Sequence, residues 1–375
     1  MNKNKPKRIL ALDGGGIRGA LTLGFLEKIE EIVREKENNP KLKLCDYFDL
    51  IGGTSTGAII AAGLSIGMSA SEIKDLYLNI GDKIFGKKRS WLLNPFKRYK
   101  AKFDYKPLDE ELKKVFGDIS IGSNKIKTGL CIITKRADTL STWPIINHPN
   151  GKFFNELKDK NNNVIGRANK DILLREAVRA SAAAPSYFIP QTIKVKNHTE
   201  FGTFIDGGIS LANNPSLQLF LVATLSEFPY KWKTGEDNIS LISIGTGTHK
   251  KKYNAKKVAK KGLLGWAKMI PELFMEDANY LNQTILQYLS NSPTPRIIDS
   301  EILDLKNDLV TEKPALHYLR YNVMLDNDEL NNLGFKFKKN EIESLHEMSE
   351  SKNKEVLYKI GSEAANRYIN PVHIK

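Results

Sequence analysis

The chain has 375 residues, of which 41% are hydrophobic and 27% are charged. These values are ordinary for a folded protein and exclude a disordered chain, and the length suits one large α/β domain or two smaller ones. The formal net charge of +14 indicates an anionic partner, for which nucleic acid, an anionic membrane face and a phosphate-bearing ligand are candidates.

The N-terminal segment is basic, but Asp13 and Arg18 interrupt its apolar run, so we do not expect a signal peptide. No window reaches the roughly 18 apolar residues that a membrane-spanning helix needs. Cys45 and Cys131 provide neither a disulfide framework nor the spacing of a metal site. We therefore expect a cytoplasmic protein that needs no metal or other cofactor.

The first predicted unit is a strand over residues 7–12, a glycine-rich loop over 13–19 (Asp-Gly-Gly-Gly-Ile-Arg-Gly) and an amphipathic helix that ends before Pro40. Such a loop gathers backbone N–H groups that favour negative charge. A dinucleotide site would need an acidic residue after a second strand about 20 residues on, and a phosphate loop would need Gly-Lys-Ser/Thr; the chain has neither. These absences weaken both nucleotide uses. The other uses of the loop are a structural turn, or an oxyanion hole in which Gly14, Gly15 and Gly16 donate N–H groups during acyl transfer.

The second unit contains Gly53-Thr-Ser55-Thr-Gly57, the G-x-S-x-G pattern of a nucleophile elbow. An apolar run over 47–51 predicts a buried strand before it, and the small apolar residues of 58–64 predict a buried helix after it. Because the turn is sharp, it exposes the Ser55 hydroxyl, and the N-terminus of the helix favours an oxyanion beside it. A glycine-serine turn without chemistry is the alternative.

The central part of the chain predicts a helix over 68–85, a strand over 126–134 and an exposed loop or hairpin over 150–167. Cap residues Asn169 and Asp171 predict the start of a helix over 172–184. Between these elements, residues 87–100 carry six cations, no acid and several aromatic residues. This run is either a solvated surface or a segment that contacts an anionic membrane.

A predicted strand over 201–205 ends in Asp206-Gly207-Gly208, which is either a plain turn or an acid at the mouth of the sheet. A further strand over 239–244 is followed by a second lysine-rich tract over 250–261. The C-terminal third predicts a helix over 279–289, an extended segment over 315–324 and an amphipathic helix over 351–369.

A serine needs a base to become a nucleophile. The histidines after Asp206 are His249, His317, His346 and His373. None follows a core strand in a loop of small residues, so the pattern does not support a Ser-His-acid triad, although it does not exclude one. The alternative is a two-residue site in which Asp206 accepts the Ser55 proton.

Together, the segments 13–19, 53–57 and 206–208 resemble the signature blocks of the patatin-like phospholipase family, and the segments 180–188 and 212–215 are similar to other family segments. The resemblance covers roughly residues 7–250. Asp-Gly-Gly stands where many members have Asp-Gly-Ala. This difference from the family pattern leaves the aspartate in place.

The resemblance implies a three-layer α/β sandwich with a central, mostly parallel sheet flanked by helices, as a catalytic domain over 7–250. A mostly helical C-terminal extension over 251–375 would pack on it. It also implies a lipid acyl hydrolase without a metal, in which Ser55 is the nucleophile, Asp206 is the base and Gly14, Gly15 and Gly16 are the oxyanion donors.

Arg18 would anchor the glycine loop or contact a phosphate. We expect a bacterial member, since some bacterial members are toxins or antiviral effectors that degrade membrane lipid when activated, in some cases by a cyclic nucleotide. The expected partners are a phospholipid membrane surface and an anionic activator, with the protein peripheral at the membrane when active. The competing hypothesis is a nucleotide- or nucleic-acid-binding protein that uses Gly14–Gly19 as a phosphate cradle.

Overall fold

A central sheet organises the protein, which is described by a computed structural model over residues 5–85, 101–196, 200–250 and 253–375. The sheet has eight strands in the order β10-β9-β1-β2-β3-β8-β7, with β4 also paired to β3. Its strands are β1 (Lys7–Leu12), β2 (Leu50–Thr54), β3 (Gly129–Arg136), β4 (Ser141–Ile146), β7 (Gln191–Lys196), β8 (Glu200–Asp206), β9 (Ile239–Ile244) and β10 (His317–Tyr321). The run from β10 to β3 is parallel, whereas β4 and β8 are antiparallel to β3, and β7 is antiparallel to β8.

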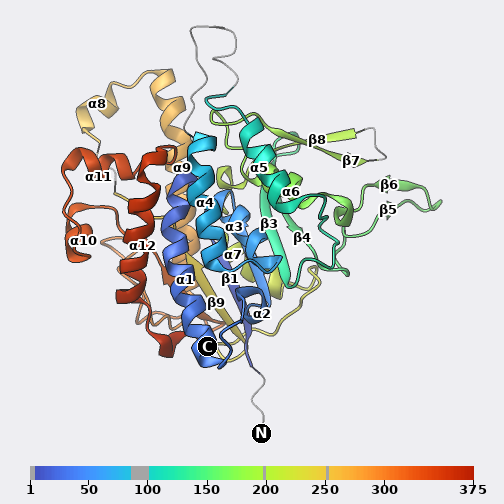
Figure 1. The fold of residues 1–375 in the computed structure, drawn as a ribbon, viewed down its shortest axis with the longest axis horizontal. Helices are drawn as coiled ribbons and strands as arrows, with labels where there is room; N and C mark the ends of the chain where they lie inside the picture. The colour runs from blue at the N-terminus through green and yellow to red at the C-terminus, as the bar shows by residue number, and fades with distance from the viewer. Residues whose placement is uncertain (1–4, 86–100, 197–199, 251–252) are drawn as a thin grey trace.

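Helices cover both faces of the sheet (Figure 1). They are α1 (Gly19–Lys36), α2 (Leu44–Tyr47), α3 (Thr56–Ser65), α4 (Ala70–Phe85), α5 (Lys106–Phe116), α6 (Leu174–Ser181), α7 (Ser216–Thr224), α8 (Ala255–Ala259), α9 (Leu263–Tyr288), α10 (Asn327–Asn332), α11 (Lys339–Leu345) and α12 (Lys354–Tyr368). The alternation of strand side chains explains the two covered faces. In β1, Leu10 and Leu12 pack on the side of α1 and α3, whereas Ile9 and Ala11 pack on the side of α7 and α9. The predicted three-layer α/β architecture is confirmed.

The C-terminal region is mostly helical, as predicted, and it also completes the sheet. Strand β10 pairs in parallel with β9 along its whole length, and α12 packs against α1 on one face. The boundary at residue 250 between a catalytic domain and an extension stays a prediction.

Several predicted boundaries were wrong. Tyr47 ends the short helix α2, and the strand before the elbow begins only at Leu50. Asn169–Asp171 forms a separate 3-10 turn, so these residues do not cap α6, which begins at Leu174. The helix expected over 279–289 is the end of α9, which begins at Leu263.

Other predicted elements agree with the structure. The segment 150–167 contains the hairpin of β5 (Leu157–Lys158) and β6 (Val164–Gly166). Ser69 and Glu72 bond to each other's backbone amide at the start of α4, which confirms the predicted cap. The basic run 87–100 and residues 251–252 of the second tract lie outside the described residues. None of the helices in the described ranges combines the length and hydrophobicity that crossing a lipid bilayer requires.

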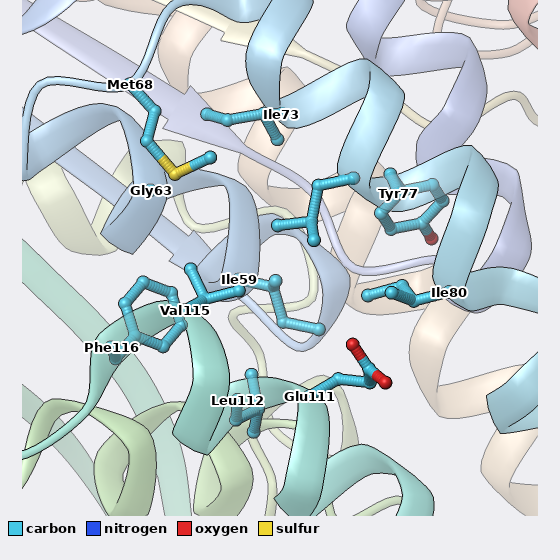
Figure 2. Close-up of a pocket in the computed structure, with 11 residues that line it drawn as sticks. Ile59, Gly63, Met68, Ile73, Tyr77, Ile80, Glu111, Leu112, Val115 and Phe116 are labelled. Atoms are coloured by element: carbon cyan, nitrogen blue, oxygen red, sulfur yellow. The ribbon is translucent and has the colours of Figure 1, made fainter.

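An apolar void lies where α3, α4 and α5 pack together, between side chains such as Ile59, Ile73 and Leu112 (Figure 2). Its volume is only ≈ 10 Å³. That is the room of about one water molecule, so this void does not accommodate an acyl chain. Its wall includes Tyr77 of α4, whose hydroxyl donates to the Gly16 carbonyl in the glycine loop.

Candidate active site

Ser55 occupies a strained turn between β2 and α3. Its φ of 56° and ψ of −121° are a conformation that residues with a side chain rarely adopt. A Cβ atom on Gly53 would lie 2.2 Å from the backbone of Gly57, and one on Gly57 would lie 2.1 Å from the Leu12 carbonyl oxygen. The two flanking glycines are therefore required by the close approach of β2, α3 and β1, as the elbow pattern predicts.

The lengths of the strands place Asp206 beside Ser55. Strand β2 ends at Thr54, which pairs with Ile133 of β3, and β3 continues beyond it. Because β4 occupies the other edge of β3, strand β8 pairs along the edge that β2 has left, and its last residue, Asp206, pairs with Thr134. The Ser55 hydroxyl donates a hydrogen bond of 2.6 Å to Oδ2 of Asp206. The structure thus joins two residues that are 151 positions apart in the sequence.

The Asp206 carboxyl group is buried, and its second oxygen, Oδ1, accepts the Gly208 amide at 2.7 Å. Desolvation by burial raises the pKa of Asp206 to about 6, against the opposing effects of the Ser55 and Gly208 hydrogen bonds. The carboxylate is therefore ionised at neutral pH yet more basic than an exposed aspartate. Such a group accepts a proton from the hydroxyl that it contacts.

The glycine loop borders Ser55 directly. A Cβ atom on Gly14 would lie 3.2 Å from the Cβ of Ser55, so a larger residue there would crowd the serine. The Gly14 amide donates to the Asn213 carbonyl at 3.0 Å and is committed to that bond. Within the described ranges, the amides of Gly15 and Gly16 have no acceptor. Of the three predicted oxyanion donors, Gly15 and Gly16 thus keep an uncommitted amide in these ranges, and their role stays a prediction.

Two hydroxyl groups fix the orientation of the loop by donating to the Gly16 carbonyl. One is Thr56 Oγ1 of α3, at 2.9 Å, and the other is the Tyr77 hydroxyl of α4. On the other side, Thr246 Oγ1 donates to the Gly14 carbonyl at 3.0 Å. The Gly14–Gly15 and Gly16–Ile17 peptides are therefore held by α3, α4 and the loop that follows β9.

A buried ion pair anchors the start of the loop. Two guanidinium nitrogens of Arg320, on β10, donate to the two carboxylate oxygens of Asp13 at 2.9 and 2.6 Å, and one also donates to Ser243. Burial raises the pKa of Asp13, and Arg320 opposes this shift. The C-terminal region thus contributes directly to the geometry of the site.

Arg18 lies buried at the beginning of α1, and burial lowers its pKa. Its Nε has no hydrogen-bond partner among the described residues. Glu276 of α9 makes the largest opposing electrostatic contribution to that pKa. This position agrees with either role expected for Arg18, an anchor of the loop or a contact to phosphate.

The histidines considered as alternative bases are engaged elsewhere. The ring of His249 stacks on that of His346 at 3.9 Å, and the ring of His317 bonds to the carbonyl of His373 at 2.8 Å. The single proton of the Ser55 hydroxyl is directed at Asp206.

Sequence reasoning missed several residues that shape the site. Asn213 lies in the segment 212–215, which resembled a family segment but had no role assigned, and Thr246 directly follows the predicted strand over 239–244. Ser181, whose hydroxyl accepts the Ser55 amide at 2.8 Å, lies in the segment 180–188, which resembled a family segment but had no role assigned. Tyr77 and Arg320 carried no signal, because only the folded chain brings them to the loop.

Comparisons with known proteins agree with these motifs. The sequence model of the family described as "Patatin-like phospholipase" matches residues 10–220. A "cGAMP-activated phospholipase" of Vibrio cholerae is 33% identical over 64% of this chain and 64% of that protein. "Patatin-like protein 2" of Arabidopsis thaliana is 34% identical over 69% of this chain and 64% of that protein. The chain thus spans less than two thirds of either relative. Human GIVD cytosolic phospholipase A2 is similar in structure, with a TM-score of 0.47 and 9% identity, over 96% of this chain and 58% of that one.

Proposed function

The chain belongs to the patatin-like phospholipase family, and from this membership we propose that it is a serine lipid acyl hydrolase that cleaves acyl esters of membrane phospholipids. The single observation that carries the proposal is the 2.6 Å hydrogen bond from Ser55 to a buried Asp206, beside two uncommitted amides of the glycine loop. In this proposal, one site contains the nucleophile, the base and the amides that stabilise the oxyanion.

The reaction follows from these contacts. Ser55 Oγ attacks the ester carbonyl carbon, and Asp206 takes the hydroxyl proton as the new C–O bond forms. The oxyanion of the tetrahedral intermediate accepts hydrogen bonds from the amides of Gly15 and Gly16. When the intermediate collapses, the lysolipid oxygen leaves with the proton held by Asp206, and Ser55 is acylated. Asp206 next removes a proton from the water that attacks the acyl-serine. When this second intermediate collapses, Asp206 returns the proton to Ser55 Oγ and the fatty acid is released.

The test is fatty acid release from phospholipid vesicles, measured for the wild type, Ser55→Ala, Asp206→Asn and the matched control Ser226→Ala. We expect both site variants to lose about 10³-fold or more in rate, while Ser226→Ala, an exposed serine, retains the wild-type rate. Far-ultraviolet circular dichroism establishes that each variant is folded. Hydrolysis near the wild-type rate by either folded site variant would exclude the dyad.

The competing phosphate-cradle hypothesis is disfavoured because several amides of the glycine loop already donate hydrogen bonds within the protein. The amides of Gly14, Ile17 and Arg18 donate to Asn213, Met348 and Gly15, respectively. Two remaining amides suit one oxyanion better than the several oxygens of a phosphate group.

A finer part of the proposal is that an anionic cyclic nucleotide activates the enzyme, as the name of the Vibrio cholerae relative states for that protein. A cavity of ≈ 510 Å³ supports it, since the residues that line it include Arg296, Arg320 and Tyr321. Arg320 also holds Asp13. A phosphate bound near Arg320 would therefore act on the residue that begins the glycine loop.

The activator test compares hydrolysis with and without cGAMP. We expect cGAMP to raise the rate of the wild type and to act more weakly on Arg296→Met, whose rate without cGAMP stays unchanged. An identical rate with and without cGAMP would refute activation by this nucleotide and leave the hydrolase assignment intact. In the same proposal, the protein is a cytoplasmic antiviral effector or toxin that degrades membranes when it is activated at their surface.

A further inference from the structure

The first half of α9 carries an exposed apolar stripe. Leu263, Trp266, Ile270 and Phe274 follow one another at helical spacing and are 86, 38, 44 and 68% exposed, and Leu273 beside them is 41% exposed. The stripe continues to Leu281, which is 46% exposed. Within the described part of α9, it is interrupted on this face by one acid, Asp277.

The core does not require this stripe. The buried residues Ala278, Asn282 and Leu286 lie in the second half of α9, which packs against α7 and Gly207–Ile209. A surface helix normally presents polar residues to water. An exposed row of large apolar side chains instead marks a surface that is covered when the protein functions.

Lysines adjoin the stripe. Lys256, Lys257 and Lys260 of α8 and its C-terminal cap are exposed. The sequence from 249 to 271 contains eight lysines and no aspartate or glutamate. The Tyr253 hydroxyl donates to Glu272 of α9 at 2.9 Å, which fixes the segment before α8 against the striped helix. An anionic lipid surface has an apolar acyl region and negatively charged headgroups. Apolar residues beside clustered lysines match both.

The stripe leads toward the Ser55–Asp206 pair. Helix α9 packs against Gly207–Ile209, the turn that follows Asp206, and Asn282 donates to the Leu211 carbonyl at 2.5 Å. Ile209 and Leu211 are themselves 41 and 64% exposed. Figure 1 shows α8 and the beginning of α9 at the end of the molecule opposite the N-terminus, the end toward which β1 runs. Exposed apolar side chains therefore lie both on α9 and on the loop after Asp206 against which α9 packs.

We propose that one surface docks the protein on bilayers that contain anionic lipid. This surface, called the α8–α9 face, consists of the lysines of 256–261 and the exposed apolar residues of α9, which are Leu263, Trp266, Ile270, Leu273, Phe274 and Leu281. The inference rests on the proposed lipid hydrolase and specifies how that enzyme meets its substrate. The apolar side chains enter the acyl region while the lysines contact headgroups. The seated face then brings the Asp206 loop to the membrane surface.

The test uses the Ser55→Ala protein, so that binding is measured without hydrolysis. Its partition onto phosphatidylglycerol and phosphatidylcholine vesicles is measured by co-sedimentation, and quenching of Trp266 by brominated lipid reports insertion. We expect strong binding only with phosphatidylglycerol, weakening as salt is added. Adding Ile270→Ser and Phe274→Ser should weaken binding at least about tenfold. The matched control adds Leu140→Ser and Val372→Ser, which are 78 and 82% exposed and lie elsewhere, and should bind normally.

A second measurement separates this inference from the hydrolase. With Ser55 intact, the Ile270→Ser/Phe274→Ser protein should hydrolyse a soluble short-chain ester at the wild-type rate but lose hydrolysis of phosphatidylglycerol vesicles. Equal vesicle binding by the stripe and control variants would overturn the docking face while leaving the hydrolase standing. The docking face would also be overturned if the wild-type protein were a dimer and the Ile270→Ser/Phe274→Ser protein a monomer, because the face would then be a subunit interface. Vesicle binding without ester hydrolysis would instead count against the proposed function.

Discussion

Replacing Asp206 by asparagine is expected to stabilise the folded protein at pH 8 while it abolishes hydrolysis. The carboxyl group is buried, and burial raises its pKa from 3.8 to about 6. One pKa unit corresponds to about 1.4 kcal/mol, so keeping the ionised group in the folded state costs about 3 kcal/mol at pH 8. Asparagine is nearly isosteric, and its side-chain oxygen can still accept the Gly208 amide. It therefore removes the charge and little else.

The stabilisation must depend on pH in one direction. A carboxyl group whose pKa is raised by folding destabilises the native state when it is ionised. The cost is absent below 3.8, grows as the pH rises toward 6 and is constant above it. The difference in free energy of unfolding between Asp206→Asn and wild type should therefore fall from about 3 kcal/mol at pH 8 to about 1 kcal/mol at pH 4.5.

Denaturant unfolding followed by circular dichroism measures this difference at each pH. Asp138→Asn is the control of opposite sign, because the hydrogen bond from Arg136 lowers the pKa of Asp138, so its removal should destabilise the protein at pH 8. A difference for Asp206→Asn that is zero at pH 8, or that does not change between pH 4.5 and pH 8, would refute the reasoning.

Three further predictions concern the same site. The kcat/KM for a soluble ester should rise with pH through about 6, since Asp206 must be ionised to accept a proton, and a flat profile from pH 5 to 8 would exclude it as the base. Tyr77→Phe should cost about 1 kcal/mol of stability and lower kcat several-fold by releasing the Gly16 carbonyl, which thermal melts and ester kinetics measure; an unchanged kcat would show that this bond does not position the loop. Arg320→Met should cost about 3–5 kcal/mol by leaving Asp13 buried without its partner, and adding Asp13→Asn should recover part of that loss in denaturant unfolding, whereas additive losses would contradict the buried pair.

The site was largely predictable because its residues lie in short motifs whose glycines have local geometric causes. The pattern around Ser55 requires a turn that admits no Cβ at positions 53 and 57, and the structure contains that turn. The Asp-Gly-Gly signal was ambiguous alone. The structure places Asp206 beside Ser55 because β3 extends beyond the end of β2, and no local sequence pattern predicts these relative strand lengths.

The supporting contacts were not predictable, because they join distant elements. Arg320 reaches Asp13 only because β10 forms one edge of the sheet. The sequence predicted an extended segment over 315–324 but placed it in a C-terminal extension and did not pair it with the sheet. Element boundaries failed for a related reason. Tyr47 has a high strand propensity, yet it ends a helical turn in which its hydroxyl bonds to the carbonyl of Lys375, a contact made in the folded chain.

The central claim is that Ser55 is a nucleophile activated by Asp206, and covalent labelling tests it most directly. The wild-type protein is treated with a fluorophosphonate at pH 8, digested and analysed by mass spectrometry. We predict one phosphonylated residue, Ser55, with labelling at least about 10²-fold slower in Asp206→Asn. An unlabelled Ser55 in the folded wild type, or equal labelling in the variant, would contradict the account.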